Sequence, residues 1–313
     1  MSVRLIVSPK SVFLSQIMEN FPSFSWGHLY YIHKIMGFVP YLPKSNKKFW
    51  IWDKWQLYSI LHILFNIFVF VEVYKAMMSF SDSQELMPFI FTLLDIFGYP
   101  FSLIFGLLTI MFRASNIILL LKYHSKVASD LSSFTIRKRK NYILNFFLCY
   151  VIYQFAASVV LSCAMLNVSY FSVGFLLNAL YSNNQLLLLD LNFCVFVMNT
   201  RCLFQDLNSG FRNLNKREVL VEELKTFRKI YPESCEVAEL VGKCFMDSIT
   251  INNCIEFVGF VLGSYLGFQR GSLINSFNML YWTAFFFCKM AVKVYICSST
   301  SKEVNMILIH CLT

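Results

Sequence analysis

The chain has 313 residues, of which 57% are apolar, 18% aromatic and only 14% charged, with a formal net charge of +9. A soluble domain carries about 45–50% apolar and about 25% charged residues, so this composition argues against a soluble enzyme. The mean hydropathy of +0.56 and the long runs of Leu, Ile and Phe predict an all-α polytopic membrane bundle. Each membrane-spanning helix needs about 20 apolar residues.

Six apolar segments are long enough to span a bilayer. In chain order they are residues 56–78, 87–112, 142–166, 170–199, 247–268 and 274–297. The first 55 residues lack the basic start, apolar run and small-residue cleavage site of a secretory signal. We therefore expect residues 1–313 to form a single transmembrane domain whose first span acts as its own insertion signal.

The basic residues predict the orientation, because Lys and Arg close to membrane spans stay on the cytoplasmic side. They are concentrated before the first span, in residues 113–141 and in residues 200–246, whereas residues 79–85 hold two acids and no base. This bias places the N-terminus and the end of the sixth span inside. It also accounts for the positive charge without a nucleic-acid partner. Asn167, in the sequon Asn167-Val168-Ser169, then faces outward as a glycosylation candidate.

The two cytoplasmic segments are predicted to be helical. Residues 113–141 carry a helix-compatible apolar stripe that includes Leu121, Val127 and Leu131. Residues 200–246 carry a second stripe, formed by Leu220, Leu224, Phe227, Tyr231, Val237, Leu240, Val241, Cys244 and Phe245. An amphipathic helix needs an apolar partner for such a face. We expect these extensions of the spans to pack against one another below the membrane.

Acidic residues occur singly in or beside the spans, without a histidine partner. They are Glu72, Asp95, Asp190, Asp247 and Glu256. Glu72 and Lys75 are spaced to pair with each other at i,i+3. Lys289 and Lys293 are interpreted as part of the positive inner end of the sixth span. With no catalytic or metal-binding motif beside these residues, we predict no enzymatic activity, no cofactor and no metal site.

Two further patterns concern helix packing. Gly259, Gly263 and Gly267 form a doubled small-xxx-small row on the fifth span, which lets another helix approach closely. Pro100 lies inside the second span, where a proline frees a backbone carbonyl and favours a kink.

Several short motifs are distributed along the chain. They are residues 24–30, 36–41 and 282–289, together with Tyr295-Ile296-Cys297, Glu303-Val304-Asn305 and Leu308-Ile309-His310. These motifs resemble insect gustatory receptors, members of a seven-transmembrane chemoreceptor superfamily shared with insect odorant receptors. The resemblance implies a tastant-gated cation channel in the plasma membrane, formed as a homo- or hetero-tetramer with related subunits. The family's pore-lining seventh span would follow Thr313, so it also implies that these 313 residues do not conduct alone.

The resemblance places tastant binding in the outer half of the bundle, where apolar walls combine with a few polar groups. The candidate contacts are Asp95, Tyr99, Gln154, Phe155, Ser158, Asn178, Tyr181, Tyr265, Phe277, Tyr281 and Trp282. Ordinary helix packing is the alternative role for each of these residues. The alternative functions are an odorant receptor of the same superfamily, a G-protein-coupled receptor with an external N-terminus, and a small-molecule transporter.

The orientation can be tested with an epitope tag at the N-terminus. We expect antibody staining only after permeabilisation, because the basic residues before the first span hold that end inside. Staining of intact cells would contradict this topology and favour the G-protein-coupled receptor.

Overall fold

The computed structural model describes residues 54–78, 97–132, 181–214, 221–269 and 273–312, together with residues 152 and 156. These ranges are helical apart from a turn at Arg113, which confirms the predicted all-α bundle. The helices are α3 (Lys54–Met78), α5 (Tyr99–Phe112), α6 (Ala114–Ser132), α9 (Asn183–Leu214), α10 (Val221–Gln269) and α11 (Leu273–Leu312).

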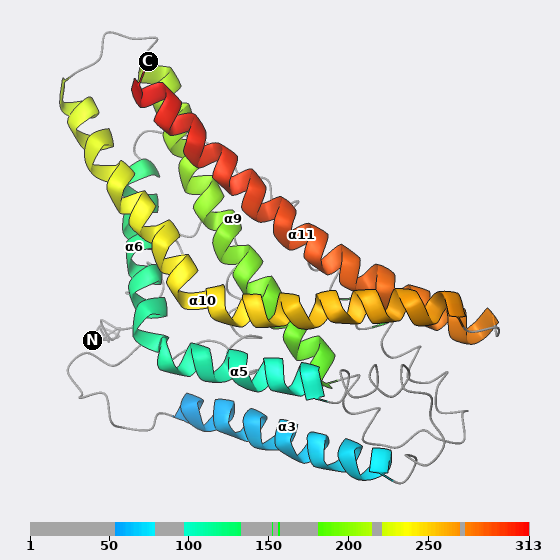
Figure 1. Cartoon of the computed structure of the whole chain (residues 1–313). Coiled ribbons are helices and arrows are strands. Elements are labelled where there is room, and N and C mark those ends of the chain that lie inside the picture. The colour runs from blue at the N-terminus through cyan, green and yellow to red at the C-terminus, as the bar shows by residue number, and fades with distance from the viewer. Residues whose placement is uncertain are drawn as a thin grey trace, which may run out of the picture.

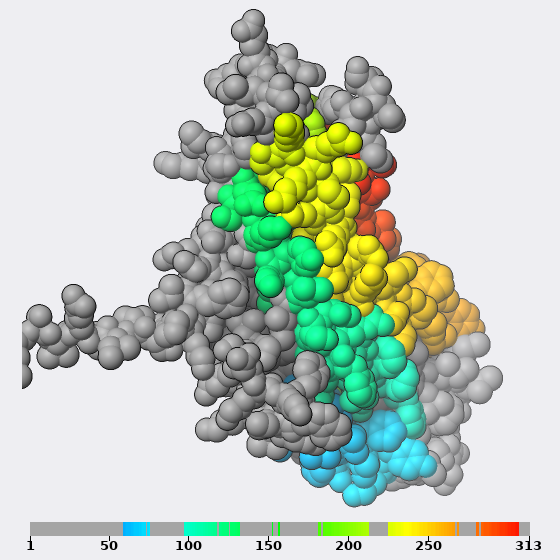
Figure 2. Space-filling view, turned by 90° about the vertical axis from the view of Figure 1, so that its left-hand side faces the viewer, coloured from blue at the N-terminus to red at the C-terminus, as the bar shows by residue number. Residues whose placement is uncertain are grey.

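The helices are arranged around α9 (Figure 1). Within the most apolar stretch of α9, 83% of the residues are buried inside the bundle. Both α10 and α11 pack along this helix. The first part of α10 runs beside α6 and its later part runs beside α5, while α3 lies against α5. Figure 2 shows α6 and the first part of α10 side by side along one face of the molecule. Since α9 is enclosed in this way, its polar side chains must find partners within the protein.

A sharp bend separates α5 from α6, whose axes meet at 68°. The bend lies at Arg113, whose guanidinium donates hydrogen bonds to the Lys243 carbonyl and the Asp247 carboxylate of α10. Figure 1 shows α10 changing direction at the same level. Pro100 takes no part in this bend, because it lies at the start of α5 and Arg113 follows its end. A proline disturbs the turn that precedes it, and residues 87–96 of the predicted second span lie outside the described ranges, so the proline kink stays a prediction.

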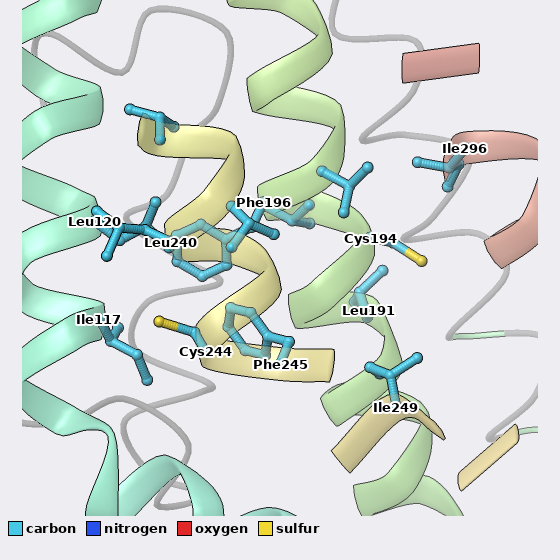
Figure 3. Packing of buried hydrophobic residues seen from close by; sticks show 14 of the residues in the cluster. Ile117, Leu120, Leu191, Cys194, Phe196, Leu240, Cys244, Phe245, Ile249 and Ile296 are labelled. Carbon is cyan, nitrogen blue, oxygen red and sulfur yellow. The ribbon is translucent and has the colours of Figure 1, made fainter. Parts of the chain in front are cut away.

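The segments predicted to be amphipathic form a packed layer. Leu121, Val127 and Leu131 of α6 are buried, and so are Phe227, Val237, Leu240, Val241, Cys244 and Phe245 of α10. Figure 3 shows Leu120 of α6 facing Leu240 of α10, and Phe196 of α9 beside Phe245, their ring centroids 5.2 Å apart. The helical structure and the mutual packing predicted for these segments are confirmed.

The described helices overlap five of the six predicted spans, and residues 142–166 lie almost entirely outside the described ranges. By length and composition, two stretches of the described chain could cross a membrane, Asn184–Arg212 and Lys225–Leu266. A third is available if α5 and α6 count as one broken span, and Ser59–Glu72 of α3 is a shorter apolar helix. Large apolar side chains are exposed on α3 and on the later part of α10. Such surfaces suit contact with lipid.

Two helical glycines allow a matched test of the packing. A Cβ at Gly210 would come within 2.7 Å of Cε1 of the buried Phe227 ring, whereas a Cβ at Gly242 would meet nothing within 4 Å. We expect Gly210→Val to destabilise the protein by about 1–3 kcal/mol through overpacking. Gly242→Ala should stabilise it by up to about 1 kcal/mol through helix propensity. Thermal melting in detergent would measure both, and shifts of the same sign would contradict the packing of α9 on α10.

Candidate functional site

Four charged side chains from three helices form a closed ring of ion pairs in the interior. Lys289 Nζ of α11 lies 3.0 Å from Asp190 Oδ2 of α9 and also contacts Glu256 Oε1 of α10. Lys293 Nζ, one turn further along α11, lies 3.3 Å from Asp190 Oδ1 and 2.7 Å from Glu256 Oε2. Each lysine therefore touches both acids, and each acid touches both lysines. We call these four residues the charge ring.

The charge ring is shielded from solvent and held by neutral polar neighbours. None of its four side chains is more than 6% exposed. Asn252 Nδ2 donates to Asp190 Oδ1 at 2.7 Å and to Glu256 Oε1 at 3.2 Å. Ser102 Oγ of α5 donates in turn to Asn252 Oδ1 at 3.4 Å. The polar network thus links α5, α9, α10 and α11.

The stability of the charge ring depends on its balance. Transfer of a charge from water into the interior costs several kcal/mol, which is recovered only when an opposite charge and hydrogen bonds satisfy it. Two carboxylates and two ammonium groups satisfy one another here, so the ring has no net charge. Removal of one member would leave an uncompensated charge among buried side chains.

The sequence analysis did not find the charge ring, because it treated the acids as isolated and assigned both lysines to the positive inner end of a span. One signal was available. Lys289 and Lys293 are spaced i,i+4 inside an apolar run, so they share one face of a helix. The two lysines on one helix face and the two acids in other spans have balanced charges, which favours pairing between them. The expected pairing of Glu72 with Lys75 is confirmed, with Nζ 2.8 Å from Oε1, and the structure places this pair on the surface.

A second polar group joins α3 to the beginning of α9. Tyr181 and Ser182 lie in a π-helical turn that leads into α9. The Tyr181 hydroxyl shares a short hydrogen bond with His62 Nδ1, which also lies 3.0 Å from Gln185 Nε2. Ser182 Oγ donates to Asn66 Oδ1 at 3.0 Å. Tyr181 and His62 are half-buried, whereas Asn66 and Ser182 are fully buried, so this group extends from the interior toward the surface.

Tyr99, another predicted ligand contact, lies in a packed junction of three helices. Its ring stacks on Phe286 of α11 with centroids 5.9 Å apart. A Cβ at Gly259 of α10 would lie 3.1 Å from Phe286 and 3.2 Å from the Tyr99 hydroxyl. Because Tyr99 is only 4% exposed, it fills the interior here and offers little surface to a ligand. A side chain at Gly259 would press on both rings, which would then have to move slightly.

The remaining predicted residues are spread over the bundle. Tyr265 of α10 is exposed and Tyr281 of α11 is half-buried, while Gly263 is buried. Phe277 and Trp282 lie on α11 and Gly267 on α10, but their side chains are not described. The residues outside the described ranges are Asp95, Gln154, Phe155, Ser158, Asn167 and Asn178. The described part thus brings Tyr99 against Gly259, and it does not gather the other predicted contacts around them.

A third polar contact joins α9 to the far end of α11. Gln205 Nε2 donates to Glu303 Oε1 at 2.8 Å, and Asn208 Nδ2 donates to the Glu303 carbonyl at 3.0 Å and to Oε2 at 3.1 Å. We call this group the Glu303 contact. Phe286, Lys289, Lys293, Ile296, Thr300 and Glu303 follow one another at intervals of three or four residues. A single face of α11 therefore carries both the charge ring and the Glu303 contact.

These features define a polytopic membrane protein, a bundle of long helices whose interior is held together by a neutral ionic core. The sequence profile of the 7tm chemosensory receptor family matches residues 28–309, and the chain belongs to this family. The match confirms the chemoreceptor resemblance of the short motifs. No curated protein matches the chain.

The charge ring makes a direct prediction for single substitutions. Lys293→Met leaves two buried acids with one lysine, and we expect it to destabilise the protein by about 3–5 kcal/mol. Lys75→Met is the matched control, because its ion pair is exposed and such pairs contribute about 0–1 kcal/mol. Thermal stability in detergent and the level at the cell surface would measure the difference. Equal stability of the two variants would show that the ring does not hold the fold together.

Proposed function

We propose that this chemosensory receptor is a gustatory receptor subunit of the plasma membrane. It binds small-molecule tastants and, together with related subunits, gates a cation current. The family match over residues 28–309 carries this proposal. The resemblance of the end of α11 to gustatory receptors adds the taste role. Glu303, in the Glu303-Val304-Asn305 element of that resemblance, holds α11 to α9 in the structure.

The group around Tyr181 is the best-placed part of the described chain to recognise a tastant. It offers a phenol, an imidazole and the amide of Gln185 within hydrogen-bond distance of one another. The Phe65 ring lies edge-on to Tyr181 with centroids 4.6 Å apart and supplies an apolar wall. Small-molecule sites combine apolar walls with a few placed polar groups. Since Tyr181 and His62 are half-buried, a ligand hydroxyl could replace their mutual hydrogen bond without entering the core.

The test of the proposed function is co-expression of this chain with a full-length receptor of the family. Cells would be exposed separately to non-volatile tastants, such as sugars and bitter compounds, and to volatile odorants, while cation current is recorded. We expect the co-expressing cells to show a tastant-evoked cation current that cells expressing the full-length receptor alone do not show. A response confined to volatiles would indicate an odorant receptor, and no ligand-evoked current in any pairing would contradict the channel.

The role of Tyr181 can be tested in the same cells. Tyr181→Phe keeps the ring but removes the hydroxyl that pairs with His62. One hydrogen bond contributes about 0.5–1.5 kcal/mol, so we expect the half-maximal tastant concentration to change by about 2- to 10-fold. Tyr295→Phe, which changes an exposed tyrosine of α11, should leave it unaltered. An unchanged response in Tyr181→Phe would remove this group from the ligand site.

A further inference from the structure

The charge ring lies in the interface between α11 and the two helices α9 and α10. Both of its positive charges come from α11, whereas the negative charges come from α9 and α10. Any shift of α11 away from either helix must therefore pull opposite charges apart among buried side chains. Because each lysine is shared by both acids, α11 is tied to α9 and α10 together.

The other contacts on this face of α11 resist movement less. Phe286 packs against Tyr99 and Gly259, and such an apolar contact has no fixed partner atom along the helix axis. The Glu303 contact is only partly buried, so water can replace its hydrogen bonds as α11 shifts. The charge ring is buried and ionic, and it is the contact most costly to open. It therefore determines whether α11 stays in place.

Charged residues inside a membrane bundle often mark ion pathways, and they can also pair with one another across helices. The balance of charges decides between these two roles. The ring contains two carboxylates and two ammonium groups that already satisfy one another, so it has no net charge with which to attract a cation. Its arrangement across three helices is what attachment requires.

We propose that the charge ring is a latch that holds α11 against α9 and α10 in the resting receptor and opens when a ligand binds. The ligand step rests on the proposed function, whereas the latch itself can be tested without ligand or current. A latch that is either closed or open provides an equilibrium that a ligand bound elsewhere can shift.

The native thiol Cys194 reports on the latch. It lies one turn beyond Asp190 on α9 and is only 3% exposed. Figure 3 shows its sulfur on the side of α9 that faces α11, where Ile296 lies. Cys254 of α10 is exposed and provides a reference thiol in the same molecule, on a helix that stays in place when α11 moves. Opening of the latch would uncover Cys194 and leave Cys254 as accessible as before.

The decisive variant removes one charge of each sign, Asp190→Asn together with Lys293→Met. The pair of Glu256 and Lys289 remains, so the interior stays neutral while the ring is cut. We expect this double variant to reach the cell surface at the wild-type level, whereas each single substitution reduces it. Labelling of Cys194 by N-ethylmaleimide in native membranes, followed by mass spectrometry of its peptide, should be about tenfold faster relative to Cys254, because a buried thiol reacts through local opening.

Glu72→Gln together with Lys75→Met is the matched control, because it neutralises an exposed ion pair of α3. It should change neither the surface level nor the labelling of Cys194. Two results would contradict the proposal that the charge ring is a latch. One is a double variant at the wild-type surface level with an unchanged Cys194 rate, and the other is a double variant lost from the surface like the single ones.

A tastant identified by current recording supplies the second part of the test. Added to the wild-type protein, it should accelerate Cys194 labelling, and it should have little further effect on the double variant. An unchanged rate in the wild-type protein would show that the ligand does not open the latch. If no tastant is found, the proposed function fails, while the comparison of variants still decides whether the ring holds α11.

Discussion

Four charges buried among helices constrain this bundle more tightly than its apolar contacts do. An apolar side chain can pack against any apolar neighbour of suitable volume, whereas a buried ammonium group must stay beside a carboxylate. Lys289 and Lys293 share one face of α11, and both must meet Asp190 and Glu256. A shift of one helix by a single residue would rotate a charge away from its partner. The register and rotation of α9, α10 and α11 are thus set together.

The Arg113 contacts extend this constraint beyond the ring. The guanidinium at the bend between α5 and α6 binds the Lys243 carbonyl and the Asp247 carboxylate of α10. Asp247 lies nine residues before Glu256 on the same helix, which corresponds to about 14 Å. Further along α6 from the bend, Lys126 Nζ pairs with Glu233 Oε1 of α10 at 2.6 Å. Polar contacts therefore join α10 to the α5–α6 pair at two places along its length, and the charge ring connects α10 to α11.

Composition and apolar periodicity predicted the helical bundle and the buried faces of α6 and α10, because these depend on local pattern alone. The end of the predicted second span at residue 112 also coincides with the end of α5. The charge ring could not be predicted in the same way, since Asp190 and Glu256 become partners only through the packing of α9 against α10. For the same reason Tyr99 could not be recognised as a core residue, because its burial depends on its contacts with Gly259 and Phe286. Local pattern identifies elements, whereas a site made by several helices depends on how they pack.

The order in which the ring residues are synthesised has a consequence for biogenesis. Asp190 and Glu256 leave the ribosome before Lys289 and Lys293, so the acids reach the membrane before their partners exist. An acid at the centre of an inserting helix costs about 2.5–3.5 kcal/mol at the translocon. Helices α9 and α10 therefore insert with unpaired acids, and their full stabilisation depends on the arrival of α11. A nascent chain that stalls before Lys289 would expose two unpaired carboxylates, a feature by which quality control could distinguish an unfinished receptor from a finished one.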